Sequence, residues 1–237
     1  MLKARIKFKK NGTMKFIGHL DVMRYFQKAM RRAEIPIAFT KGFSPHMIMS
    51  FAQPLGIGLT SDGEYFDIEV EEYIDPEEAI KRLNETMVEG MEVSNFVYIS
   101  DNKKLSGMTI TAAADYHVYP LLSIKSSENR LKIPEEWSEK IADFMKQEEI
   151  IVLKKTKKSE KEVYIRHMIY DMRVDGDAVY LYLATGSEQN LKPDLVMETF
   201  LQFIGEEIPM HYHRLDVYAR NEQGKLAPLD AFVEEVD

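Results

Sequence analysis

The sequence predicts an α+β fold made of two ferredoxin-like halves packed together, each with the element order β-α-β-β-α-β. Three observations predict it. Short segments alternate apolar and polar residues, as half-buried strands do, and longer segments between them have helical spacing. The same order of elements recurs on both sides of a polar segment at residues 100–107, the expected linker. The predicted domains are residues 1–100 and 108–237.

The first predicted half opens with a strand at residues 3–9, where Ala4, Ile6 and Phe8 alternate with basic residues. After a turn at Asn11-Gly12, we expect residues 14–17 to stay extended. The remaining elements of this half are a helix at 19–34 ended by Pro36, strands at 48–59 and 64–71 joined by a turn at Ser61-Asp62-Gly63, a helix from Asp75-Pro76 to about Val88, and a strand at 91–99.

The second predicted half repeats this pattern without sequence identity to the first. Its helices begin near Pro134 and Pro193, which suit a first helical turn. Its elements are a strand at 109–124, a helix at 134–147, strands at 149–156 and 161–184 with a hairpin turn at Asp175-Gly176-Asp177, a helix at 193–204 and a strand at 210–219.

Charge is distributed unevenly along the chain. The net charge is −8, but residues 3–46 hold eleven Lys or Arg against two acids, Asp21 and Glu34. A local basic segment can bind phosphate even when the rest of the protein is acidic. The alternative is a solvated helix face with basic strand edges, which would carry no function.

The composition excludes several kinds of chemistry. The chain has no cysteine, which rules out disulfides, thiolate catalysis, zinc–thiolate sites and ordinary iron–sulfur clusters. Gly56-Ile57-Gly58 lacks the third glycine and the following helix of a phosphate-binding loop. No apolar run approaches the roughly 18 residues of a membrane helix, and the basic N-terminus precedes no apolar signal region. We expect a cytoplasmic protein with no membrane, metal or cofactor site.

Three short pieces of the basic segment are candidates for function. The first is the helix start, with His19 and Asp21; the second is the helix face that follows; the third is the loop after the helix. The expected substrate- or phosphate-binding residues are Arg24, Lys28, Arg31, Arg32, Lys41 and Phe43, and the candidate catalytic residues are His19, Asp21 and His46.

Each residue type has a chemical reason to be there. Arginine presents a planar fork to phosphate, a helix N-terminus offers free N–H groups, and Phe43 could stack on a base. His19 and His46 could act as acid and base, or with Asp21 as weak metal ligands. Against these readings, His19 could cap or pack the helix, and Phe43 could anchor its loop.

Geometry raises an objection to a single compact site. The segments entering and leaving a helix lie at its opposite ends, and a helix of about 16 residues is about 24 Å long. His19 and His46 can meet only if the loop at residues 40–47 folds back along the sheet. If it does not, the segment is a binding surface rather than a catalytic site.

The quoted motifs resemble a known bacterial family. The runs Phe16-Ile17-Gly18-His19-Leu20-Asp21, Arg31-Arg32-Ala33-Glu34-Ile35-Pro36 and Thr40-Lys41-Gly42-Phe43-Ser44-Pro45-His46 are similar to radical-SAM-linked proteins of unknown function, encoded beside or fused to a radical SAM enzyme. The resemblance spans most of the chain, including Asn190–Val196. It departs at Gly18, where the pattern has Ser, and at Met47, where it has Pro.

The resemblance implies an accessory role. A radical SAM protein would be the partner and would bring the iron–sulfur cluster that this chain cannot build, while this chain would hold the substrate. RNA is the expected substrate class, because radical SAM enzymes often modify RNA, and tandem ferredoxin-like folds often bind it. Two alternatives stay open: an acid/base enzyme acting on a phosphodiester or nucleotide through His19 and His46, and a protein-interaction adaptor.

Overall fold

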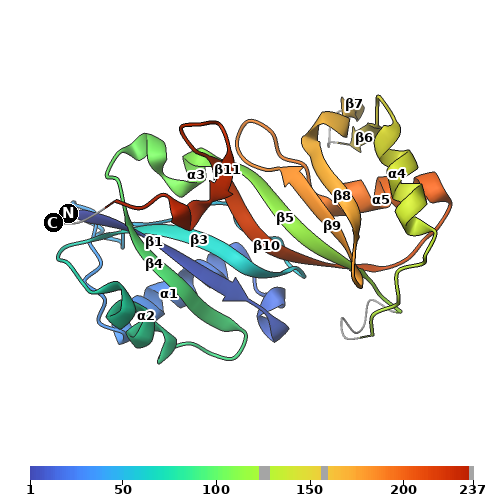
Figure 1. Ribbon diagram of the computed structural model, residues 1–237. Helices are drawn as coiled ribbons and strands as arrows, with labels where there is room; N and C mark the ends of the chain where they lie inside the picture. Colours follow the sequence, from blue (N-terminus) through green and yellow to red (C-terminus); the bar gives the residue numbers. More distant parts are fainter. Residues whose placement is uncertain (123–128, 156–159, 235–237) are drawn as a thin grey trace. The chain divides into compact units, whose positions relative to one another are not determined.

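The structure is a computed structural model that describes residues 1–122, 129–155 and 160–234 (Figure 1). It is a mixed α+β fold with mostly antiparallel strands and few helices. The chain forms two compact units: unit 1 comprises Met1–Ala112 with Arg214–Asp237, and unit 2 comprises Ala113–His213. The two units are described separately.

Unit 1 is built on an antiparallel sheet with the strand order β4-β1-β3-β10, to which β2 adds on β3 and β11 on β10. The register places Ile6 opposite Phe66 on β3 and Phe96 on β4. The strands are β1 (Leu2–Lys10), β2 (Met49–Phe51), β3 (Thr60–Val70), β4 (Met91–Ile99), β10 (Met210–Arg220) and β11 (Leu226–Pro228).

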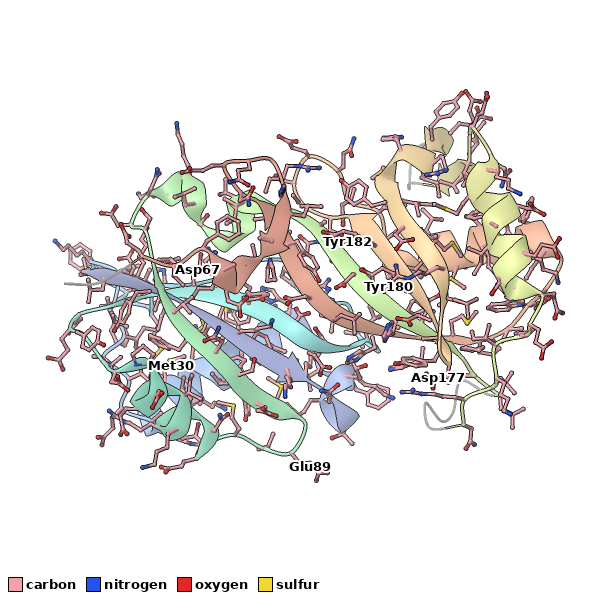
Figure 2. The ribbon with its side chains drawn as sticks, in the orientation of Figure 1. Met30, Asp67, Glu89, Asp177, Tyr180 and Tyr182 are labelled. Atoms are coloured by element: carbon pink, nitrogen blue, oxygen red, sulfur yellow. The ribbon has the colours of Figure 1, made fainter. Side chains whose placement is uncertain are left out.

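Two helices pack on one face of this sheet, α1 (His19–Arg32) and α2 (Pro76–Asn84). The apolar side of α1 places Phe26 and Met30 against Ile6 and Phe66 of the strands, and Figure 2 labels Met30 on this side. The Asp75 side chain caps α2 by accepting the Glu78 N–H. The predicted helix at 19–34 is confirmed, and the second helix ends at Asn84 rather than near Val88.

The opposite face of the sheet is also covered. Two short helices, η2 (Lys103–Leu105) and η4 (Leu229–Ala231), and α3 (Gly107–Ile110) supply the cover. Arg5 has none of its side chain exposed; it forms an ion pair with Asp67, labelled in Figure 2, and donates to the Leu105 and Leu229 carbonyls. Asp67 also accepts the Gly107 N–H. The segment expected to be a linker is therefore packed onto the sheet.

Three segments of unit 1 differ from the sequence-based expectation. Of the strand predicted at residues 48–59, only Met49–Phe51 (β2) forms a strand. Residues Gly12–Phe16 form a 3₁₀ helix, η1, rather than extended chain. Ser61-Asp62-Gly63 lies within β3 instead of forming a turn. A Cβ at Gly63 would lie 2.6 Å from the Leu215 carbonyl oxygen, so glycine is needed here for close approach of two strands and not for a turn.

The chain end belongs to a different unit from the one expected. Residues 214–237, placed by the sequence in the domain at 108–237, return to unit 1. Two carboxylates of this segment bind polar side chains of unit 1. Lys7 forms an ion pair with Asp216, and the Tyr65 hydroxyl donates to Asp216 and Asp230. The division into domains 1–100 and 108–237 thus differs from the compact units.

Unit 2 has a sheet with the order β5-β9-β8 and a separate two-stranded sheet, β6-β7. Trp137 and Phe144 of one helix pack edge-on against Phe200 of the other. The elements are β5 (Thr111–Pro120), α4 (Trp137–Lys146), β6 (Ile151–Lys155), β7 (Glu160–Tyr164), the 3₁₀ helix η3 (Arg166–Met168), β8 (Ile169–Asp175), β9 (Ala178–Ala184) and α5 (Pro193–Ile204).

The expected elements of this half are found with shifted bounds. The helices at 134–147 and 193–204 and the hairpin at Asp175-Gly176-Asp177 are confirmed. The strands predicted within 161–184 are β7, β8 and β9; the 3₁₀ helix η3 lies between β7 and β8, and the confirmed hairpin joins β8 to β9. Residues 123–124 and 156, at the ends of two predicted strands, lie outside the described residues. The division into two complete ferredoxin-like halves remains a prediction.

Candidate phosphate-binding surface

Helix α1 carries a row of exposed basic residues. Its buried side chains, among them Val22, Phe26 and Met30, face the sheet, which leaves the other side to solvent. Four exposed cations recur there at i, i+4, i+7 and i+8 and cover about 12 Å of helix. They are called the α1 basic stripe, and they are Arg24, Lys28, Arg31 and Arg32.

The stripe is largely unneutralised. Arg24 lies 3.4 Å from Asp21, but both side chains are about two-thirds exposed, so the pair contributes little. Within the described residues, no ion pair or hydrogen bond engages the side chains of Lys28, Arg31 or Arg32. Their charge is therefore available to a ligand.

The basic residues of β1, by contrast, are neutralised within unit 1. Their carboxylate partners come from distant segments: Lys3 pairs with Glu69, Lys7 with Asp216, and Lys9 with Glu92. Arg5 pairs with Asp67 in the buried cluster. Most of the positive charge of residues 3–46 that is not neutralised therefore lies on the α1 basic stripe and Lys41.

The loop after α1, Lys41–His46, closes on itself. The Thr40 N–H donates to the His46 carbonyl at 2.9 Å, and the His46 N–H donates to the Thr40 hydroxyl at 3.1 Å. The His46 ring nitrogen Nδ1 lies 3.1 Å from the same hydroxyl, and Phe39 and Met47 form a β-bridge beneath. These bonds hold a compact loop whose six residues are all exposed.

Phe43 at the tip of this loop is completely exposed. None of the aromatic contacts among the described residues involves its ring, whereas the rings of Phe8, Phe26 and Phe66 pack against one another in the core in edge-on or tilted arrangements. The alternative interpretation of Phe43 as a loop anchor is therefore wrong. Lys41 is exposed beside it.

The loop lies at the end of the sheet where α1 finishes. The Lys10 ammonium donates to the Ile17 carbonyl, which places the start of α1 beside the last residue of β1. Ile37, after α1, bridges Val70, which pairs with Leu2 at the opposite end of β1. Arg31, Arg32 and the Lys41–His46 loop thus occupy the same end of unit 1.

His19 and Asp21 lie at the other end of α1. The His19 ring packs edge-on against Phe51 with 5.1 Å between centroids, and burial lowers its pKa. The extended chain from Phe51 back to Met47, next to His46, spans roughly 13 Å. His46 keeps its hydrogen bonds within its own loop, so the loop does not fold back toward His19.

Two buried charge clusters were not found from the sequence. Arg214 of β10 lies 3.0 Å from Glu64, and burial raises the pKa of this carboxyl while the Arg214 and Lys10 charges oppose the rise. Burial also raises the pKa of Tyr65, which donates to two carboxylates. Both clusters join β3 to the C-terminal segment. Their partners are far apart in sequence, so no local pattern reveals them.

The described residues were also searched by geometry and hydropathy for a metal site and a membrane-spanning helix. Among them, no group of three or more His, Asp or Glu side chains is arranged to hold a metal ion. In the same part of the chain, no helix is both long and apolar enough to cross a membrane.

The chain was compared with known proteins. No curated protein matches it. The solved structures that match include one described as "Crystal Structure of a Cbf5-Nop10-Gar1 Complex", with 12% identity and a TM-score of 0.48. The match covers 90% of this chain and 48% of the other, so this chain spans about half of that protein's length. A similarity this distant carries no functional argument.

A family model matches residues 3–193, which include the α1 basic stripe and the Lys41–His46 loop. The chain therefore belongs to the family described as "Uncharacterized protein conserved in bacteria (DUF2344)".

Proposed function

We propose that this protein is an accessory, substrate-binding partner of a radical SAM enzyme and that it holds RNA or another phosphate-bearing substrate on the α1 basic stripe. The observation that carries the proposal is the stripe itself: cations on one helix face, three of them without an ion-pair partner among the described residues, on a chain of net charge −8. Evenly distributed surface charge would not produce such a face.

Phosphate fits this surface for physical reasons. Arginine binds phosphate oxygens through a planar fork, and each contact releases condensed counterions, which favours binding at low salt. Lys41 extends the positive charge at the end where Arg31 and Arg32 lie. Because His19 and His46 lie in separate surroundings, binding is favoured over acid/base catalysis by this pair.

The radical SAM partner in this proposal rests on the family resemblance. The chain has no cysteine to bind an iron–sulfur cluster, so that chemistry would come from the partner in the cytoplasm.

We also infer a ferredoxin-like fold for each unit. In unit 1, the order β4-β1-β3 with β2 on β3, and α1 and α2 on one face, supports it. In unit 2, β5-β9-β8 with α4 and α5 supports it, β6 and β7 being an addition.

Fluorescence anisotropy with a labelled RNA tests the binding proposal. The variant R24A/R31A/R32A removes three charges from the stripe and should bind at least tenfold more weakly at about 50 mM salt. A matched control, K81A/K132A/K192A, removes the same charge from exposed lysines elsewhere and should bind like the wild type. Equal losses in both variants, or no RNA binding by the wild type, would contradict the proposal.

A pull-down from cells tests the partner. We expect the protein to retain a radical SAM enzyme, and RNA that nuclease treatment removes. If a stable protein complex forms without RNA, and the stripe variant disrupts it, the adaptor hypothesis is correct instead.

A further inference from the structure

We propose that the ligand of this surface is single-stranded RNA and that Phe43 stacks on one of its unpaired bases. The inference rests on the proposed function and makes it more specific, since a basic stripe alone would bind duplex and single strand alike. It comes from the combination, at one end of unit 1, of an exposed aromatic ring with cations that have no ion-pair partner in the described part of the chain.

The exposure of Phe43 needs a reason. Burial of a phenylalanine side chain stabilises a folded protein, and the fully exposed Phe43 ring contributes no such stabilisation. Most phenylalanines of unit 1 are buried, and the rings of Phe8, Phe26 and Phe66 form one cluster of edge-on and tilted contacts. A ligand that covers the Phe43 ring would recover the lost burial.

The loop presents this ring in a fixed way. Its base is held by the Thr40–His46 hydrogen bonds and by the bridge between Phe39 and Met47. Gly42, directly before the ring, has φ of +122°, a conformation that side chains disfavour, and a Cβ there would meet no other atom. Glycine is thus required by backbone geometry and not by crowding, and it shapes the tip that carries Phe43.

The basic residues near the Phe43 ring indicate which class of ligand binds there. Lys41 lies two residues away, and Arg31 and Arg32 lie at the same end of the sheet without ion-pair partners in the described structure. Single-stranded nucleic acids are bound by this combination, in which cations contact the backbone and an aromatic ring stacks on a base. A base in the interior of a duplex has both faces occupied by its neighbours, so along a strand only unpaired bases can cover Phe43.

The experiment measures stacking directly. The chain has a single tryptophan, Trp137, which is fully buried in unit 2. In the variant Phe43→Trp, a stacked base should quench the new, exposed indole, while the wild type gives the background. The probes are a 12-nucleotide oligouridylate, its duplex with oligoadenylate, and inorganic polyphosphate, which carries charge without bases.

Truncation of the ring gives the second measurement. Phe43→Ala should weaken oligouridylate binding roughly 5- to 100-fold and leave polyphosphate binding unchanged. Phe43→Trp should restore it. The matched control is Phe16→Ala, which removes another exposed phenylalanine, next to the opposite end of α1, and should leave binding unchanged.

The outcomes separate this inference from the proposed function. If oligouridylate binds and needs Arg31 and Arg32, but Phe43→Ala has no effect or the duplex binds equally well, stacking is wrong and the basic surface stands. If neither RNA nor polyphosphate binds the wild type at low salt, both are wrong. If Phe43→Ala instead abolishes a nuclease-resistant protein complex, with RNA binding intact, the ring docks a protein and the inference is overturned.

Discussion

Replacement of Asp67 by Ala tests whether the buried charge cluster holds unit 1 together. Asp67 accepts hydrogen bonds from Arg5 Nε at 2.7 Å, from Arg5 Nη2 at 3.0 Å and from the Gly107 N–H at 2.7 Å. The variant leaves the Arg5 guanidinium, with no exposed side-chain surface, without its counter-charge. Loss of one partner of a buried ion pair costs about 3–5 kcal/mol.

The assay is urea denaturation followed by far-UV circular dichroism, with hydrogen exchange at the Gly107 amide as a local readout. We expect the free energy of unfolding of unit 1 to fall by about 3–5 kcal/mol and the Gly107 amide to lose protection. Glu72→Ala is the control, because it removes one carboxylate from the exposed turn after β3 and should cost under about 0.5 kcal/mol.

A second variant separates charge from packing. The double variant Arg5→Met with Asp67→Leu removes both charges and keeps apolar volume, so it should recover much of the lost stability. If Asp67→Ala costs no more than Glu72→Ala, water solvates Arg5 in the variant. The inference that this face of the sheet is sealed by the segments around Leu105 and Leu229 would then be refuted.

Three further predictions concern binding, backbone and pH. With four stripe cations on a single strand, log K should fall with log salt at a slope of about −2.8, and Arg31→Ala with Arg32→Ala should reduce this slope by about 1.4 in anisotropy titrations; an unchanged slope would exclude both from phosphate contact. Gly90→Ala adds a Cβ 2.4 Å from the Asn11 carbonyl oxygen at a φ of +88°, and should cost at least about 2 kcal/mol in denaturation, well above Gly176→Ala, where φ is positive but space is open. Burial lowers the pKa of His19 from 6.5, so the unfolded chain binds the proton more readily, and His19 contributes a loss of stability as pH falls below about 6.5; His19→Gln should remove this contribution, and identical pH profiles would contradict it.

The elements of the candidate site follow from local sequence. Helix α1 was predictable because apolar residues, among them Phe26 and Met30, recur at helical spacing while Arg24, Lys28 and Arg31 recur on the other side. The Lys41–His46 loop was predictable because glycine, serine and proline favour turns. The division of α1 into a buried and a basic face is a property of its own residues, and tertiary packing left it unchanged.

Whether the other basic residues are exposed or paired with carboxylates was not predictable from local sequence. Alternation in β1 correctly places Arg5 and Lys7 on the face opposite Ile6, but periodicity does not say whether that face meets water or protein. The structure covers it with residues 103–110 and 226–231: the Leu105 and Leu229 carbonyls bind Arg5, and the Asp230 carboxylate lies 3.7 Å from the Lys7 ammonium. The partners are separated from β1 by long stretches of chain, so only the fold brings them together.

The same distinction applies to the exposed aromatic ring and the two histidines. Sequence alone determined that a basic two-faced helix is followed by a turn bearing Phe43, because helical spacing and turn formation depend on neighbouring residues. Only the tertiary structure decided that the Phe43 ring is fully exposed and that His19 and His46 lie apart. Burial and proximity depend on which distant segments pack together, and that is set by the whole sheet.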